Sequence, residues 1–187
     1  MIKIHFGGSR SLSASYFPLV AEVVSVPMQL GCYVNVGCAV GADEAVIEAA
    51  LGCDPSRLSV FAQFSESGEG SFSGSAYVPV VAAKKEGAQV SFLSGGPLSL
   101  PLKARLMRRS KVALSGCAGS VFFLSKPFSP GSLKVAAEAV KKNQIVYVIP
   151  CGFSGAPAPL RSVSGFWQAS HFFGFPGFQW FTGLPLF

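Results

Sequence analysis

Residues 2–10, IKIHFGGSR, and residues 34–43, VNVGCAVGAD, decide the fold of this chain. In each stretch a short apolar strand ends in glycine-rich backbone that we expect to open a helix. Glycine lets the backbone turn tightly and lets a ligand approach it closely. The N-terminus of a helix presents unpaired N–H groups and a partial positive charge. The two stretches therefore predict a place to hold a phosphate group.

Apolar runs alternate with helical patterns along the chain. The runs are too continuous for half-exposed strands and are typical of strands buried on both faces. They lie at 2–6, 33–36, 58–62, 89–93, 120–124 and 145–149, and the predicted helices at 16–30, 42–51, 78–85, 100–110 and 132–142. This pattern predicts an α/β fold, a Rossmann-like open, mostly parallel sheet with helices on both faces. Ligands of such sheets bind beyond the carboxyl ends of the strands.

Two segments depart from this alternation. Residues 63–76 include eight Gly or Ser and little to bury, so we expect a mobile loop above the sheet edge. Residues 153–187 are rich in Gly, Pro and aromatic side chains and carry almost no charge. We therefore divide the chain into a Rossmann-like domain, 1–152, and an aromatic-rich extension, 153–187. We expect the extension to pack on the domain, and the alternative is an interface in a homodimer.

Composition and charge narrow the function classes. Five cysteines without a CxxC pair indicate free thiols in a reduced, cytoplasmic setting. No apolar run approaches the roughly 20 residues that cross a bilayer, and no signal-peptide pattern is present, so we expect no membrane partner. Residues 1–86 hold five Lys or Arg against eight acidic residues, whereas residues 87–187 hold ten against Glu138 alone. This asymmetry predicts an anionic partner, and the alternative is a solvated basic face.

Four segments at strand ends are expected to converge on one site. They are the two glycine turns, the basic helix around Arg105, and the entrance of the last helix with Lys126 before it. Arg105, Arg108 and Arg109 follow i, i+3, i+4 spacing, which predicts one helix face that could clamp phosphates; the alternative is a solvated basic face. The predicted ligand-binding residues are Gly7, Gly8, Ser9, Arg10, Gly37, Cys38, Gly41, Ala42, Asp43, Lys126, Ser129, Pro130, Gly131 and Ser132.

The sequence carries no familiar catalytic motif, since HExxH, GxxxxGK[ST] and GxSxG are all absent. His5 lies inside a strand, where a hydrogen-bonded core imidazole is expected. Cys38 follows a turn that could lower its thiol pKa, but no histidine is placed to activate it. Asp43 has two interpretations, compensation of its helix dipole or acceptance of a ribose hydroxyl. We predict no catalytic residue, no metal and no required cofactor, with a bound nucleotide or phosphate as the expected ligand.

The order of these motifs resembles the DNA-processing A (Smf) family and its wider superfamily, SLOG, which includes the Lonely Guy proteins. The resemblance covers Ile2 to Gly152 and rests on short motifs that follow one another in the same order. These motifs lie at residues 8–10, 36–43, 50–51, 94, 100–101, 103, 105, 131–133 and 146–150. It implies a Rossmann-like domain with a phosphate-binding cleft.

The chain also departs from these families. The DNA-processing A family usually has arginine where Val40 stands and asparagine where Ala104 stands. Residues 130–138 keep the proline-to-glutamate spacing of the Lonely Guy PGGxGTxxE motif, but Leu133 and Lys134 replace its central residues. The catalytic arginine of those enzymes would fall near Leu102, which argues against phosphoribohydrolase activity. We expect Glu138 to pair with Lys134 or Lys142 on the helix surface.

Three functions remain, in decreasing order of preference. The first is a sensor or carrier that binds a phosphate-bearing, nucleotide-derived ligand. The second is single-stranded DNA binding, resembling the DNA-processing A recombination mediator. Its basic groove would use Arg10, Lys103, Arg105, Arg108 and Arg109. The third is a degenerate nucleotide phosphoribohydrolase.

Overall fold

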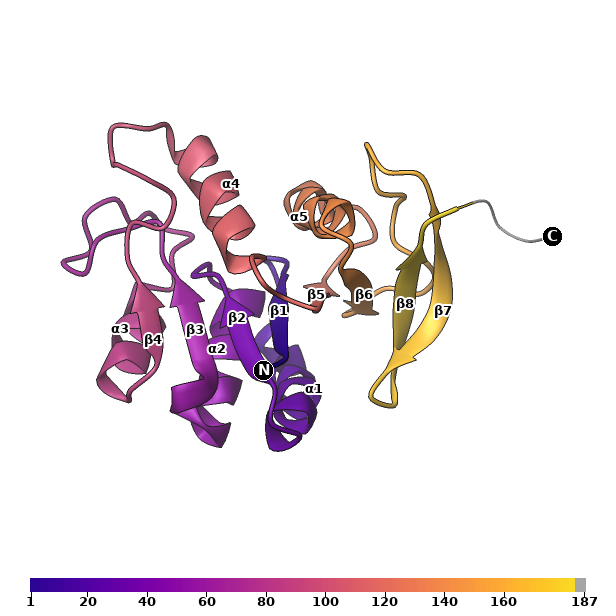
Figure 1. Ribbon diagram of the computed structural model, residues 1–187, viewed down its shortest axis with the longest axis horizontal. Coiled ribbons are helices and arrows are strands. Elements are labelled where there is room, and N and C mark those ends of the chain that lie inside the picture. The colour runs from indigo at the N-terminus through magenta and orange to yellow at the C-terminus, as the bar shows by residue number, and fades with distance from the viewer. Residues whose placement is uncertain (184–187) are drawn as a thin grey trace.

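Eight strands form one sheet in the computed structural model, which describes residues 1–183 (Figure 1). The predicted extension's last four residues, 184–187, lie outside this range. The elements are β1 (Lys3–Gly8), η1 (Ala14–Tyr16), α1 (Phe17–Gln29), β2 (Tyr33–Val36), α2 (Ala42–Cys53), η2 (Pro55–Arg57), β3 (Leu58–Phe61), α3 (Tyr77–Lys85), β4 (Gln89–Ser91), α4 (Leu102–Ala113), β5 (Gly119–Leu124), α5 (Pro130–Lys141), β6 (Ile145–Pro150), β7 (Phe166–Phe172) and β8 (Phe175–Phe181).

The sheet has the strand order β4-β3-β2-β1-β5-β6-β8-β7. The first six strands in this order are parallel to their neighbours, and β8 and β7 are added antiparallel. The order of strands reverses between β1 and β5, which pair from Ile4 with Gly119 to Gly8 with Phe123. Loops that leave the two strands at such a switch point diverge and leave a crevice at the carboxyl ends.

Each face of the sheet has its own hydrophobic core. On β5, Val121 and Phe123 belong to the core under α1, α2 and α3, whereas Phe122 and Leu124 belong to the core under α5. Side chains alternate between the faces of a strand, so apolar residues at successive positions are buried on both sides. The α/β prediction, a mostly parallel sheet covered on both faces, is confirmed. None of the helices within residues 1–183 is long and apolar enough to span a membrane.

A hairpin in the extension was absent from the sequence prediction. β7 and β8 are joined by Phe173 and Gly174, whose φ angles are 48° and 90°. Positive φ at both central residues is the geometry of the tight hairpin turn that suits twisted strands. β8 pairs with β6, so the hairpin continues the sheet at the right-hand end of Figure 1. The aromatic runs on either side of this Phe-Gly pair were a usable signal for two strands.

The loop at 63–76 contributes to the core, contrary to the expectation that it has little to bury. Gln63 and Phe64 are both fully buried. The Gln63 amide donates to the Ser75 hydroxyl at 2.8 Å, and the Val40 N–H donates to the Gly74 carbonyl at 3.1 Å. The first bond ties the two ends of the loop to each other, and the second attaches its C-terminal end to the second glycine turn.

Candidate functional site

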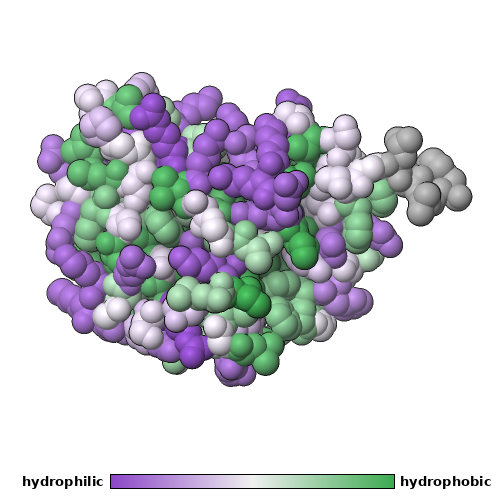
Figure 2. Space-filling view, in the orientation of Figure 1, coloured by the Kyte–Doolittle hydropathy of each residue, from purple (hydrophilic) through white to green (hydrophobic). Residues whose placement is uncertain are grey.

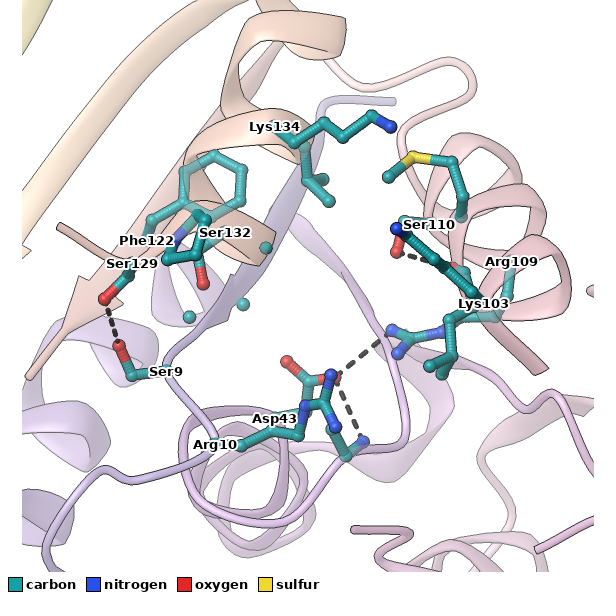
Figure 3. A pocket seen from close by; sticks show the side chains of 18 of the residues that line it. Ser9, Arg10, Asp43, Lys103, Arg109, Ser110, Phe122, Ser129, Ser132 and Lys134 are labelled. Carbon is teal, nitrogen blue, oxygen red and sulfur yellow. Dashed lines mark hydrogen bonds and ion pairs between the residues drawn. The ribbon is translucent and has the colours of Figure 1, made fainter. Parts of the chain in front are cut away.

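A cleft of about 1200 Å³ lies at the carboxyl ends of β1 and β5, between α4 and α5 (Figure 3). Its walls come from residues 7–11 at the end of β1, from the cleft-facing side of α4, and from residues between 126 and 135. Hydrophilic side chains gather around α4 and α5 on the face seen in Figure 2. The cleft is thus located where the reversal of strand order predicts a ligand site.

Four cations line this cleft with their side chains in solvent: Arg10, Lys103, Lys126 and Lys134. Within residues 1–183, none of the four forms an ion pair. The Arg10 guanidinium lies over the ring of Phe72, 5.6 Å from its centroid, which supports the side chain at the mouth of the cleft. The rim therefore carries uncompensated positive charge.

Asp43 is buried and paired with Arg109. The Arg109 guanidinium donates to Asp43 Oδ2 at 3.2 Å, and the Ala39 N–H donates to the same oxygen at 3.1 Å. Each side chain of the pair is 8% exposed. Burial raises the pKa of Asp43, although Arg109 opposes this shift. Because Arg109 compensates the carboxylate, Asp43 does not cancel the charge of the rim.

The three arginines of α4 do not form the predicted phosphate clamp. Arg105 is buried and donates to the carbonyls of Gln63 at 2.9 Å and Gly70 at 3.4 Å, so it holds the 63–76 loop. Arg109 is engaged with Asp43, and Arg108 is exposed outside the residues that line the cleft. Helical spacing correctly brings the three onto neighbouring positions, but it contains no information about which of them meet the sheet.

The second glycine turn is occupied by internal hydrogen bonds, so α2 does not present a free N-terminus to the cleft. The Gly41 N–H donates to Glu44 Oε2 at 3.2 Å, and the Ala42 N–H donates to the Ser9 carbonyl at 3.1 Å. Of the predicted residues in this turn, Asp43 lines the cleft, whereas Gly37, Cys38, Gly41 and Ala42 do not. At Gly37 a side chain would collide with Arg109, which explains the glycine without a ligand.

The first glycine turn also differs from its prediction, because no helix begins directly after it. α1 begins only at Phe17, after the short η1. Ser9 instead joins this turn to the one after β5: its hydroxyl accepts from the Ser125 N–H at 3.0 Å and lies 3.1 Å from the Ser129 hydroxyl. Gly7, Gly8, Ser9 and Arg10 all line the cleft.

The entrance of α5 is the predicted helix N-terminus that opens on the cleft. Ser129, Pro130, Gly131 and Ser132 all line it, and the Ser129 side chain makes no capping hydrogen bond. The first N–H groups of a helix lack intrahelical partners, so this turn can donate to an anion. Lys134 follows Pro130 by four positions and reaches the same cleft, a consequence of helical spacing that the prediction missed.

Two candidate reactive groups are held in their neutral forms. Burial lowers the pKa of His5 to about 3, and its Nδ1 has no hydrogen-bond partner within the described residues, contrary to the expected bonded imidazole. His5 lies at the cleft with its ring 5.5 Å from that of Phe122. Burial raises the pKa of Cys38, so the lowering considered for a thiol at this turn is not found. Neither side chain is charged at neutral pH.

Glu138 lies outside the cleft. It pairs with Lys111 of α4 and Lys141 of α5, each at 3.0 Å, rather than with the predicted Lys134 or Lys142. Both hydrogen bonds lower the pKa of Glu138. Within residues 1–183, no group of three or more His, Cys, Asp or Glu is placed to hold a metal ion.

Comparison with known proteins identifies the fold. No family model and no curated protein matches the sequence. The X-ray structure of DNA processing protein A from Streptococcus pneumoniae is similar, with a TM-score of 0.62 and 22% identity over 80% of this chain and 50% of that chain. A structure that describes the single-stranded DNA binding mode of DNA processing protein A from Helicobacter pylori has a TM-score of 0.63 and 15% identity, over 80% of this chain and 65% of that chain.

These likenesses confirm at the level of the fold the resemblance found in the sequence motifs. The chain spans half of the Streptococcus protein and less than two thirds of the Helicobacter protein.

Proposed function

We propose that this chain is a member of the DNA-processing A family and binds single-stranded DNA in the cleft between α4 and α5. The observation that carries the proposal is the set of four exposed cations on the rim, none of them in an ion pair within residues 1–183. The backbone of a nucleic acid carries one negative charge per phosphate, and Lys and Arg that neutralise it release counterions. The paired Asp43 leaves this attraction intact.

The cleft also offers contacts of the kinds that a single strand needs. The free N–H groups at the start of α5 suit a phosphate, with Lys126 and Lys134 beside them. The Phe72 ring lies under the Arg10 guanidinium next to the cleft, outside the residues that line it, and rings next to a cationic groove allow bases to stack without sequence preference. The fold supports the same choice, since one of its structural neighbours is described by its single-stranded DNA binding mode.

A nucleotide-derived small molecule is the second candidate, and the bottom of the cleft favours it. Gly7 leaves room beside His5 and Asp43, where a side chain would approach both within 3.3 Å. One phosphate at the start of α5 and one sugar or base above Gly7 would fill that space. Hydrolysis of such a ligand is not proposed, because Glu138 lies away from the cleft in ion pairs with two lysines.

Salt dependence distinguishes the two candidates. We expect a fluorescein-labelled oligothymidylate of about twelve nucleotides to bind with an affinity that falls steeply with salt, since each neutralised phosphate of a single strand releases roughly 0.7 counterion. A mononucleotide with few phosphate contacts should give a much flatter slope. Fluorescence anisotropy at several salt concentrations measures both.

Arg10→Ala should weaken the oligonucleotide about tenfold or more, as expected for loss of a charge-assisted contact. Lys142→Ala is the matched control, because Lys142 is an exposed cation at the opposite end of α5 from the cleft. Failure of the wild-type protein to bind the oligonucleotide at low salt would overturn the DNA proposal. If Arg10→Ala and Lys142→Ala bind the oligonucleotide with equal affinity, Arg10 does not contact it.

A further inference from the structure

A second, smaller groove of about 290 Å³ adjoins the cleft. It lies between the first turn of α5 and the segment that leads toward β7. The lining residues are Phe128, Pro130, Leu133, Lys134, Pro159, Arg161 and Ser162. Of these residues only Pro130 belongs to the site predicted from the sequence, and Arg161 belongs to the extension.

The groove shares a wall with the cleft. Phe128, Pro130 and Lys134 line both hollows. Phe128 is 55% exposed, so its ring is open to a ligand. The Arg161 guanidinium lies 6.0 Å from the centroid of the Phe128 ring. An aromatic ring and a cation thus stand together where the cleft opens into the groove.

The segment that carries Arg161 is attached to the domain. The Ala158 N–H donates to the Pro127 carbonyl at 2.9 Å, and the Trp167 indole N–H donates to the Ala158 carbonyl at 3.0 Å. Leu160, next to Arg161, is 4% exposed and belongs to the core of the α5 face. These contacts fix the backbone below the groove and leave the Arg161 side chain in solvent.

We propose that this groove is a second nucleotide subsite, in which a base stacks on Phe128 and the adjoining phosphate contacts Arg161 and Lys134. The inference rests on the proposed binding of single-stranded DNA in the cleft. Within residues 1–183 neither cation forms an ion pair, so both can neutralise a phosphate. Base stacking on an aromatic ring next to Arg or Lys is the general means of holding a single strand. A bound strand would leave the cleft over the start of α5 and cross the extension.

Oligonucleotide length tests this path. The probes are labelled oligothymidylates of about four and about twelve nucleotides, at the lower and upper parts of the range of single-strand site sizes. Arg161→Ala should weaken the longer probe about tenfold and leave the shorter one, which fits within the cleft, unchanged. Phe128→Ala should weaken the longer probe about tenfold and the shorter one less, because its ring lines both the cleft and the groove. Arg161→Ala should also reduce the salt slope by about 0.7, whereas Phe128→Ala should not change it. Lys142→Ala is again the control.

Placing 5-iodouracil along the longer probe gives an independent readout, because photocrosslinking to Phe128 reports the contact directly. If the wild-type protein binds the longer probe and both variants bind it equally well, the groove is not a subsite and the cleft proposal stands. Equal weakening of both probes also overturns a subsite beyond the cleft. No binding of either probe by the wild-type protein overturns both proposals.

Discussion

Arg10 and Arg109 both line the cleft and carry the same charge, but Arg10 is exposed to solvent and Arg109 is buried. Arg10 is exposed and forms no ion pair, whereas Arg109 is 7% exposed and pairs with Asp43. An exposed cation can be exchanged with little effect on folding and can contact an incoming phosphate. A buried one holds the structure, because its removal leaves the carboxylate without a partner.

Arg109→Met should therefore destabilise the protein by about 3–5 kcal/mol at neutral pH. The double variant Arg109→Met/Asp43→Asn should recover part of this loss, because the amide oxygen still accepts from the Ala39 N–H.

The destabilisation of Arg109→Met should also depend on pH. Burial already raises the pKa of Asp43, and loss of Arg109 removes an influence that lowers this pKa. The native variant then binds a proton more readily than the unfolded chain, so its deficit should shrink as the pH falls toward about 5. Urea unfolding at several pH values measures this, and a constant deficit would contradict it.

His5 should make the protein sensitive to acid. Its pKa is lowered from the ordinary 6.5 to about 3 in the folded protein, with burial as the main cause and the charge of Arg109 as the second. The unfolded chain therefore binds a proton that the native protein does not, and stability falls as the pH decreases from about 6.5 toward 3. The slope from this residue is at most about 1.4 kcal/mol per pH unit.

His5→Phe should lose that slope, because no titratable group remains at the position. Urea unfolding at pH values from about 7 to 4 compares the variant with the wild-type protein. The difference in unfolding free energy should change with pH over this window, and parallel curves for the two proteins would refute the assignment.

At the scale of one element, α2 contains two glycines in opposite situations. Gly41 stands at its N-cap with φ 81°, and a Cβ there would lie 2.5 Å from the Arg10 carbonyl oxygen and 2.7 Å from that of Ser9. Gly52 lies in the last turn of the helix with no atom within 4 Å of an added Cβ. Glycine is thus required where the two glycine turns touch, and it is replaceable at the far end of the helix.

Gly41→Ala should destabilise the protein by about 2 kcal/mol or more, because strained backbone and a clash with carbonyl oxygens act together. Gly52→Ala should stabilise it by about 0.5–1 kcal/mol, since alanine loses less backbone entropy in a helix. Thermal or urea unfolding of the pair provides the measurement. Equal effects of the two changes would show that the contact between the turns has no energetic role.

At the scale of the whole molecule, the extension completes both the sheet and a core. β8 pairs with β6, and Trp180 is 5% exposed in the core of the α5 face. Trp167 and Trp180 pack edge to face with ring centroids 5.0 Å apart. Removal of these residues would expose the edge of β6 and the apolar surface beneath Trp180, and such edges promote association between chains.

Truncation after Gly152 should therefore cause aggregation and a large loss of stability. The soluble fraction, size-exclusion chromatography and thermal unfolding of the truncated chain measure the outcome. A monomer as stable as the full chain would mean that the extension contributes nothing to the fold. A folded monomer obtained from a full-length dimer would instead support an interface between two copies.

The sequence by itself determined the alternation of strands and helices and the order of the strand ends that meet at the cleft. Continuous apolar runs and helical periodicity are local signals, because each depends on residues a few positions apart. Lys126 and Ser129 were predicted to lie at one site because the carboxyl ends of parallel strands meet at one edge of a sheet, and both line the cleft. The β7–β8 hairpin was not predicted, because the extension was judged by its composition and not searched for strands. The hairpin depends on a turn with positive φ at Phe173.

Only the tertiary structure decided what each charged side chain does. Arg109 meets Asp43 across 66 residues, Arg105 meets Gln63 across 42, and Glu138 meets Lys111 on another helix. Arg105 and Arg109, one helical turn apart on α4, consequently have different partners, although their spacing in the sequence places them on the same helix face. The cation of Arg161 comes to the groove beside the cleft through the packing of the extension. Pairing and burial depend on which elements touch, and no pattern within one segment contains that information.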